Sequence, residues 1–295
     1  MELDKHEASA LSHLFSASVI RDFGKRSCSP LFTRLLEHTR IDPSSRRGYT
    51  VGAAFDEAFD LLSRSRFRDD YVYRSAIMQK ILLGRHSLNT ATLLNEIRAG
   101  SCKADVVVLN GTSTAYEIKS ERDSLARLQN QISNYRCVFA SVNVVVSKSH
   151  LHEVFQVVPE DVGIITLSKR FNLHTERKAQ ICPERTVPTM ILEMLRTEEA
   201  AEILTHFGYD VPDVPNTKMR SELSHIFVDL DAANVHDEMV RVLRKTRSQA
   251  DLADFINSVP KSIRAASLAV RPNFKNRVSI KKAIDTPLIE ALAWK

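Results

Sequence analysis

The sequence predicts an α/β protein with a mixed β-sheet in the middle of the chain and helical regions before and after it. Three observations support this fold class. Short β-branched runs appear after residue 103, an Asn-Gly pair at 110–111 follows the first run, and helical apolar spacing dominates both ends. Such runs are typical of buried strands, and Asn-Gly is a strong hairpin signal. We therefore expect helical regions at 1–68 and 187–295 around a core at 69–186.

The expected strands are 93–99, 104–109, 115–119, 142–146 and 163–167, with 163–167 as the last. Segment 93–99 also contains residues that favour a helix, and we assign a strand because it directly precedes Gly100 and the next strand. A helix from Ser124 to about Arg136 separates two strands, which implies a parallel crossover joined to the antiparallel hairpin. A short helix is expected at 150–157.

The flanking regions show the apolar spacing of helices. Leu11, Leu14, Phe15 and Val19 form one expected helical face, and Phe55, Phe59 and Leu62 form another. A loop is expected at 43–48, and a helix at 71–83 that Gly84 ends. The expected C-terminal helices are 190–195, 198–206, 221–230 and 235–244.

Composition limits the class of protein. The 295 residues carry a formal net charge of +5, which permits a polyanionic partner without requiring one. No apolar stretch is long enough to span a membrane, and the first residues lack a signal-peptide pattern. The cysteines are scattered, without a C-x-x-C pair, so disulfides and a zinc ribbon are not expected. We expect a protein of the reducing cytoplasm.

The strongest chemical signal is the segment Glu117-Ile118-Lys119. Side chains alternate along a strand, so Glu117 and Lys119 share one face and Ile118 points to the other. The position of Asp105 on the preceding strand depends on the hairpin loop. A two-residue loop places Asp105 opposite Tyr116, on the wrong face, whereas a three-residue loop places it opposite Glu117. Only the longer loop, or a bulge, brings the two carboxylates together.

Two neighbouring carboxylates and a lysine suit phosphodiester cleavage. Mg²⁺ or Mn²⁺ binds to one or two carboxylates and leaves positions for water and substrate oxygens. Asp105 and Glu117 are the candidate ligands, with the Ile118 carbonyl as a third. Lys119 would orient the attacking water or stabilise the charge that develops on the phosphate.

Asp105 followed by Glu117-Ile118-Lys119 resembles the D…(D/E)xK motif of the PD-(D/E)xK, or restriction-endonuclease-like, nuclease superfamily. Gln131 and Tyr135 resemble its QxxxY motif, found in RecB-like members. About residues 70–170 are also similar to a poorly characterised bacterial family of small RecB-like predicted nucleases, in which an Asn-Glu pair like 95–96 precedes the aspartate. The resemblance implies an αβββαβ core and makes Glu96 a third acidic residue. The proline of the motif name is replaced by Ala104.

Arg127, Gln131 and Tyr135 are spaced four residues apart and form one stripe on the expected helix. Gln131 could hold a ligand water or a phosphate, Arg127 could clamp a phosphate, and Tyr135 could pack beneath the site or stack on a base. Each feature also has a structural interpretation. Glu117 and Lys119 could be an exposed ion pair, Tyr135 a core residue, Arg127 a solvated charge and Glu96 a surface helix residue.

Residues 255–284 contain seven lysines and arginines and no acidic residue. Lys261, Arg264, Arg271 and Lys275 are the candidates for phosphate contacts in this segment, although a solvated helix face would have the same composition.

The sequence therefore predicts a Mg²⁺- or Mn²⁺-dependent nuclease that acts on DNA in preference to RNA, with a homodimer as an assembly suggested only by analogy. Phage defence, mobile-element maintenance and DNA repair all suit such an enzyme. The alternatives are an inactive nucleic-acid-binding module with the same fold and a helical adaptor that binds a partner.

Overall fold

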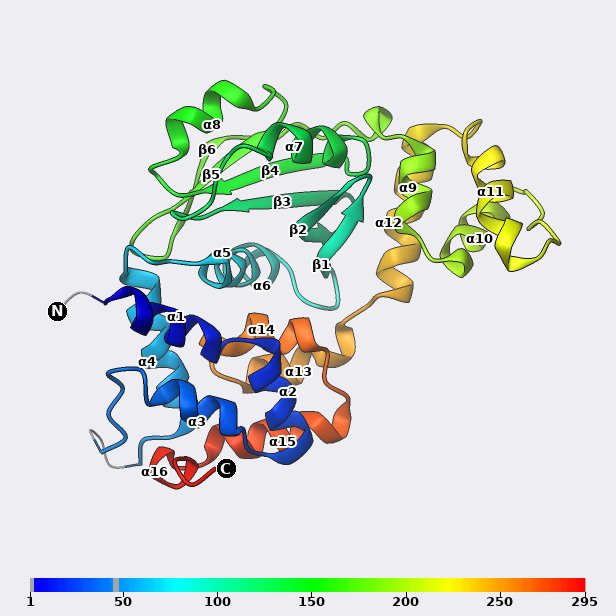
Figure 1. Ribbon diagram of the computed structural model, residues 1–295. Coiled ribbons are helices and arrows are strands. Elements are labelled where there is room, and N and C mark those ends of the chain that lie inside the picture. The colour runs from blue at the N-terminus through cyan, green and yellow to red at the C-terminus, as the bar shows by residue number, and fades with distance from the viewer. Residues whose placement is uncertain (1–2, 45–47, 295) are drawn as a thin grey trace.

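A computed structural model of the chain describes residues 3–44 and 48–294. A six-stranded mixed sheet lies between helices, and a second, wholly helical lobe lies beneath it (Figure 1). This arrangement confirms the predicted α/β class. The expected loop at 43–48 falls in part on 45–47, which lie outside the described residues. No helix in the described part of the chain is long and apolar enough to cross a membrane.

The strands follow one another across the sheet in chain order. They are β1 (Thr92–Ala99), β2 (Cys102–Leu109), β3 (Ser113–Lys119), β4 (Ser141–Val146), β5 (Gly163–Leu167) and β6 (Leu173–Arg177). The β3–β4 and β4–β5 pairs are parallel, and the other pairs are antiparallel. The strand assignment for 93–99 and the parallel crossover are confirmed. The expectation that 163–167 is the last strand is wrong, because the edge strand β6 is mostly polar and exposed and lacks the apolar pattern of a strand.

Helices cover both faces of the sheet. On one face lie α5 (Asp70–Ile77), a π-helical turn η1 (Met78–Leu82) and α6 (Leu83–Arg85), so this helix ends one residue beyond Gly84. On the other lie α7 (Leu128–Arg136) and α8 (Leu151–Val157). Val106 and Ile118 pack toward α5, whereas Val107 and Ala115 pack toward α7. Alternation along the strands thus creates two separate cores.

The crossover helix begins later than expected. Ser124 does not cap α7, since its hydroxyl accepts a hydrogen bond from the Ala126 backbone N–H at 3.2 Å and forms a turn. The Leu128 N–H then bonds to the Leu125 carbonyl at 2.9 Å, and α7 starts at Leu128. A local serine turn here competes with the helix for the same backbone groups.

Four further helices extend the α7 side of the sheet. They are α9 (Pro188–Met194), α10 (Thr197–His206), α11 (Asn216–Phe227) and α12 (Ala232–Thr246), and a 3₁₀ turn η2 (Pro183–Arg185) precedes them. His236 of α12 is fully buried, and its Nε2 lies 2.8 Å from the Ser113 hydroxyl of β3. This polar contact joins α12 to the sheet across 123 positions.

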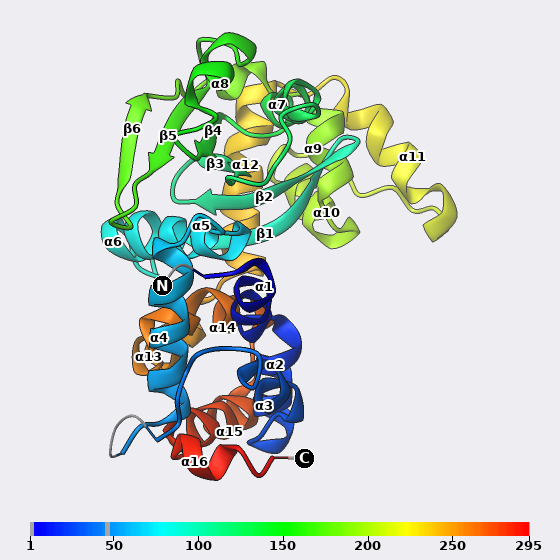
Figure 2. The same ribbon diagram turned by 60° about the vertical axis from the view of Figure 1, so that its left-hand side comes forward.

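The helical lobe contains both ends of the chain (Figures 1 and 2). From the N-terminal side come α1 (Lys5–Leu14), α2 (Ala17–Arg26), α3 (Pro30–Leu36) and α4 (Val51–Arg64). From the C-terminal side come η3 (Ala250–Leu252), α13 (Ala253–Ser258), η4 (Lys261–Ile263), α14 (Arg264–Val270), α15 (Phe274–Asp285) and α16 (Leu288–Ala291). Backbone hydrogen bonds join the two sides: Val51 N–H donates to the Thr286 carbonyl at 3.0 Å, and Leu288 N–H to the Tyr49 carbonyl at 2.7 Å.

The expected single helical face from Leu11 to Val19 is wrong. Its apolar residues are buried, but they belong to two helices. The Ser16 hydroxyl accepts a hydrogen bond from the Val19 backbone N–H and caps the start of α2. A serine at this position favours a new helix start over continuation of α1.

Candidate active site

The β2–β3 hairpin brings the two predicted acidic residues together. Leu109 pairs with Ser113 and Val106 with Tyr116, so the loop has three residues, with Gly111 at a φ of 103°. This is the longer of the two loops considered from the sequence. In this register Asp105 and Glu117 come next on their strands, and directly opposite residues share a face of the sheet.

The side chain of Asp105 takes the place of a backbone hydrogen bond between β2 and β3. Regular pairing of β2 with β3 stops at Val106, and Asp105 Oδ2 instead accepts a hydrogen bond from the Ile118 N–H at 2.8 Å. A residue's N–H and C=O project to the same edge of a strand, so the Ile118 carbonyl also faces Asp105. The structure therefore places this carbonyl on the side where the sequence proposes it as a third ligand.

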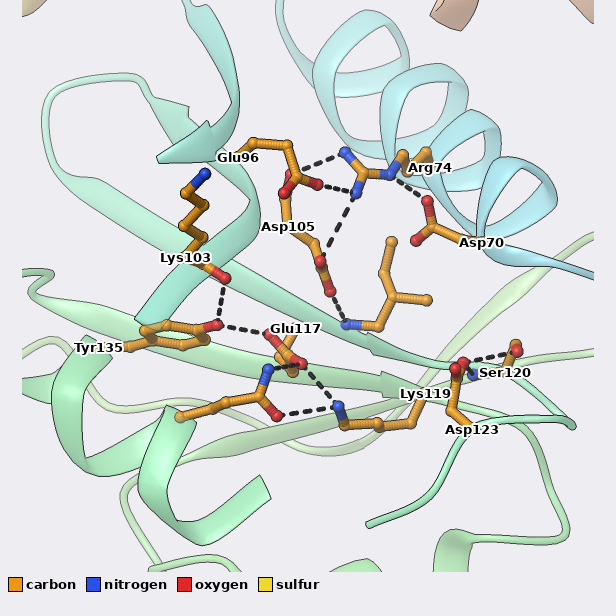
Figure 3. A network of polar contacts seen from close by, with 12 residues as sticks. Asp70, Arg74, Glu96, Lys103, Asp105, Glu117, Lys119, Ser120, Asp123 and Tyr135 are labelled. Atoms are coloured by element: carbon orange, nitrogen blue, oxygen red, sulfur yellow. Dashed lines mark hydrogen bonds and ion pairs between the residues drawn. The ribbon is translucent and has the colours of Figure 1, made fainter. Parts of the chain in front are cut away.

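Glu117 and Lys119 form a buried pair beneath α7 (Figure 3). Lys119 Nζ lies 2.7 Å from Glu117 Oε1, and the two residues are only 6% and 1% exposed. The Gln131 amide bridges them, donating to Glu117 Oε1 at 2.5 Å and accepting from Lys119 Nζ at 2.9 Å. The interpretation of these residues as an exposed ion pair is wrong, because α7 covers this part of β3.

Tyr135 completes the network from the next turn of α7. Its hydroxyl lies 2.8 Å from Glu117 Oε2 and 2.6 Å from the Lys103 carbonyl. Burial, aided by the negative charge of Glu117, raises the pKa of Tyr135 above its ordinary range, so the hydroxyl stays protonated and can donate. The ring is completely buried and offers no face on which a base could stack. The expectation that Tyr135 could stack on a base is therefore wrong. Tyr135 packs beneath the site and supports Glu117.

Arg74 of α5 lies beside the acidic residues and was not among the residues chosen from the sequence. Its guanidinium pairs with Asp70 and with Glu96, and it donates to the Asp105 carbonyl at 3.0 Å. Its Nη2 is also 3.5 Å from Asp105 Oδ1. Because the four-residue spacing from Asp70 to Arg74 is that of a common helical ion pair, the spacing by itself does not mark Arg74 as a site residue.

Glu96 of β1 is a third acidic residue, next to Asp105 across the strands. The β1–β2 register, with Asn95 opposite Val106 and Ile97 opposite Ala104, places Glu96 opposite Asp105. Its backbone has a φ of 53°, which is uncommon for a residue with a side chain. Glu96 is therefore a strand residue and not a surface helix residue, and its carboxylate contacts Arg74.

The electrostatic environment of Asp105 favours a cation. Burial and the negative charge of Glu117 raise the pKa of Asp105 to about 7, and the Ile118 N–H and Arg74 only partly oppose this shift. Two carboxylates and a backbone carbonyl are the hard oxygen ligands that Mg²⁺ prefers. Among the described residues no three histidines, cysteines or acidic residues gather into a metal cluster. An Mg²⁺ ion held by one or two carboxylates keeps several of its water ligands.

A short turn leads from β3 to the crossover segment. Asp123 Oδ2 accepts from the Ser120 N–H at 2.8 Å and from the Ser120 hydroxyl at 2.6 Å. Glu121 pairs with the buried Arg68, whose guanidinium also donates to the Ser168 carbonyl at 2.9 Å. These contacts hold the chain immediately after Lys119 in place.

The remaining predicted nucleic-acid contacts are not gathered at the carboxylates. Arg127 is exposed just before α7, and its side chain makes no hydrogen bond or ion pair with another described residue, although its backbone carbonyl accepts from the Gln131 N–H at 3.0 Å. Lys261, Arg264, Arg271 and Lys275 lie in the helical lobe, on η4, α14 and α15 or between them. Arg264 donates to the Asn257 carbonyl at 3.1 Å, so part of its donor capacity is used within the lobe.

Comparison with known proteins identifies a relative in a phage. The chain is 28% identical over 177 residues to Protein cII of Enterobacteria phage P4, an alignment that covers 58% of this chain and 64% of the relative. The chain thus spans less than two thirds of that relative. No solved structure matches the chain. The family model of Bacteriophage P4 protein cII matches residues 63–271, which include the sheet, α5, α7 and every candidate site residue except Lys275. The chain belongs to the bacteriophage P4 protein cII family.

Proposed function

We propose that this chain is a Mg²⁺- or Mn²⁺-dependent nuclease of the restriction-endonuclease-like class that hydrolyses phosphodiester bonds, with DNA as the preferred substrate. One observation carries the proposal. Glu117 and Lys119 are buried side by side in the register that places Asp105 opposite Glu117, and Gln131 and Tyr135 of α7 hold Glu117 in position.

The burial of these charges needs an explanation. A buried carboxylate is costly unless it is paired or binds a metal, and a well-packed apolar pair would stabilise the fold at least as well. Here two polar side chains from α7 and one lysine surround a single glutamate. Such a fully hydrogen-bonded cluster stabilises a sheet no better than apolar side chains would, but it holds a reactive group in a defined orientation.

The residues have distinct roles in the proposed reaction. Asp105, Glu117 and the Ile118 carbonyl would hold the metal ion, which supplies Lewis-acid charge at the phosphate and a more acidic water. Lys119 orients the attacking water or donates to the phosphate oxygen that gains charge. Gln131 and Tyr135 keep Lys119 and Glu117 in place, and Arg127 is free to contact the substrate backbone.

A second candidate function is a nucleic-acid-binding module that has lost catalysis. The observation in its favour is Arg74, whose guanidinium already lies against Glu96 and Asp105. Because the Arg74 guanidinium already neutralises part of the carboxylate charge, a metal ion would be attracted to this site less strongly. This candidate predicts nucleic-acid binding without metal-dependent cleavage.

The biological setting follows from the same proposal. Membership in a phage family suits an enzyme of phage or mobile-element DNA. We place its activity in the cytoplasm, with a homodimer as the assembly that would cut both strands of a duplex.

The deciding experiment is cleavage by the purified chain. Linear and circular duplex DNA, single-stranded DNA and RNA are incubated with Mn²⁺, with Mg²⁺ or with EDTA. Asp105→Ala and Lys119→Ala should abolish metal-dependent cleavage, whereas Lys103→Ala, an exposed lysine on the same strand as Asp105, should retain it. If the chain binds nucleic acid but cleaves it under none of these conditions, the binding module is favoured. If the chain neither binds nor cleaves nucleic acid, the remaining alternative is a helical adaptor that binds a partner.

A further inference from the structure

A hollow of about 730 Å³ lies on the α6 side of the sheet, away from α7. Its walls come from the end of the α5–α6 helix, the β2–β3 hairpin loop, the first residues of β3 and β4, and the chain around β6. Hollows of this size hold ligands as large as a nucleotide.

The charges around this hollow have one sign. Lys80, Arg85 and Lys178 line it together with His86 and His174, and no aspartate or glutamate is among its lining residues. Lys80 lies over the Phe171 ring at 5.8 Å. Within the described chain, none of the three cations forms a hydrogen bond or an ion pair. By contrast, Arg136 on the other side of the sheet is paired with Asp161 at 3.0 Å.

The floor of the hollow contains polar side chains beside the apolar Val108 and Ile165. Thr114, Tyr116 and the buried Asn143 contribute to it from β3 and β4. The Asn110 side-chain nitrogen lies 2.8 Å from His86 Nε2, and its buried Oδ1 has no hydrogen-bond partner among the described residues. If the amide is turned over, its nitrogen is the atom without a partner, so one buried polar atom is uncommitted in either orientation.

This hollow is separate from the candidate active site. Thr114 and Tyr116 point to the opposite face of β3 from Glu117 and Lys119. Thr114 also precedes Glu117 by three residues, which is about 10 Å along a strand. A ligand in the hollow would therefore not touch Glu117 or Lys119.

We propose that this hollow is a second binding site, for a phosphate-bearing ligand of nucleotide size. A guanidinium and two ammonium groups without acidic partners are the groups that bind phosphate oxygens, and imidazoles and hydroxyls supply further hydrogen bonds. The phosphate comes either from a free nucleotide or from one nucleotide of a nucleic-acid strand. The site does not depend on the proposed nuclease activity, since it shares no residue with the carboxylate cluster.

The test is calorimetric titration of the full chain in EDTA and low salt, with tripolyphosphate, a deoxynucleoside triphosphate and a short single-stranded oligodeoxynucleotide as probes. The double variant Arg85→Gln/Lys178→Gln should weaken binding at least tenfold. The matched control Lys25→Gln/Lys218→Gln removes the same charge from exposed positions on α2 and α11 and should bind like the wild type. Thermal unfolding of each variant checks that these surface changes leave the fold intact.

The outcomes separate the two ligand sources. Equal binding of the triphosphate and the oligonucleotide indicates a free nucleotide, and binding of the oligonucleotide alone indicates a strand. Because the titration is done in EDTA, binding in the hollow is measured without the metal ion that the nuclease proposal requires. The proposal is overturned if no probe binds the wild type, if the double variant binds as tightly as the wild type, or if the control variant loses as much affinity as the double variant.

Discussion

Lys119 Nζ and Glu117 Oε1 lie 2.7 Å apart in a pair that is almost wholly buried, although both side chains come from a single strand. Residues two apart on a strand share a face, so β3 alone brings them near each other. The covering helix α7 removes water and adds Gln131 and Tyr135 as hydrogen-bond partners. The same contact is therefore both a stabilising pair and the centre of the candidate active site.

Replacing Lys119 with methionine should lower both stability and cleavage. The change leaves the Glu117 carboxylate buried without its counter-charge, and breaking a buried pair costs about 3–5 kcal/mol. Urea unfolding measures the loss of stability, and cleavage of DNA with Mn²⁺ should fall at least about 100-fold. Lys103→Met, at an exposed lysine, is the matched control. A Lys119→Met protein with wild-type cleavage would remove Lys119 from the mechanism.

Tyr135→Phe should separate support of the site from contact with nucleic acid. The variant loses the hydroxyl that meets Glu117, with an expected cost of about 1 kcal/mol in stability and about a tenfold drop in kcat. Because the ring is completely buried, the Kd for single-stranded DNA should stay unchanged. A clear loss of DNA affinity with an intact fold would show that Tyr135 reaches the substrate after all.

Mn²⁺ should stabilise the wild-type protein and not Asp105→Asn. A ligand that binds only the folded state stabilises it by about 2.7 kcal/mol at 100 times its Kd. For a chain of this size that corresponds to a rise in Tm of roughly 4 °C. Differential scanning fluorimetry measures the shift, with Glu153→Gln, an exposed acidic residue on α8, as the control. Equal shifts in all three proteins would contradict a site at Asp105.

Arg74→Gln tests whether the resident guanidinium competes with the metal. The change removes a positive charge from the neighbourhood of Glu96 and Asp105, so Mn²⁺ should bind about tenfold more tightly. Calorimetric titration measures the affinity. Weaker binding in Arg74→Gln, in a folded protein, would show instead that Arg74 positions the carboxylates for the ion.

Stability should fall in mild acid because of His236. Burial lowers the pKa of this imidazole below its ordinary value of 6.5, although Asp237 partly opposes the shift. Above this value both the folded and unfolded states carry a neutral ring. Below it the unfolded chain gains a proton that the folded chain resists, so the free energy of unfolding decreases as pH falls toward the lower, folded-state pKa.

Urea unfolding between about pH 8 and pH 5 checks this dependence against His236→Gln, which cannot titrate. The variant loses the contact with Ser113 and should be about 1 kcal/mol less stable at pH 8. That difference should shrink as pH falls. A difference that stays constant across the range would exclude His236 as the source.

Much of the candidate site follows from local sequence. Period-two alternation places Glu117 and Lys119 on one face, and Asn110-Gly111 marks the hairpin that returns β3 toward Asp105. The α/β class and the parallel crossover follow from the same alternation and from the helix between β3 and β4. These features depend on neighbours within a few residues, which is why the sequence alone can predict them.

Other features depend on contacts between distant segments. The choice of a three-residue loop over a two-residue loop rests on the packing of both strand faces, since the turn residues permit either. The burial of Glu117 and Lys119, the position of Arg74 and the fully buried ring of Tyr135 arise only when α5 and α7 close on the sheet. Strand β6 was missed because an edge strand satisfies its backbone without an apolar pattern.

The sequence by itself determined strands β1 to β5 of the core and the acidic and lysine residues of the candidate site. Only the tertiary structure decided that both chain ends build one helical lobe, that His236 reaches Ser113, and that unpaired cations surround a hollow on the far face of the sheet. The physical reason is that alternation and turn preferences act locally. Burial of apolar faces, in contrast, brings together helices and strands that are hundreds of residues apart in the sequence. The spacing of apolar residues shows that a helix has a buried face but not which element that face packs against.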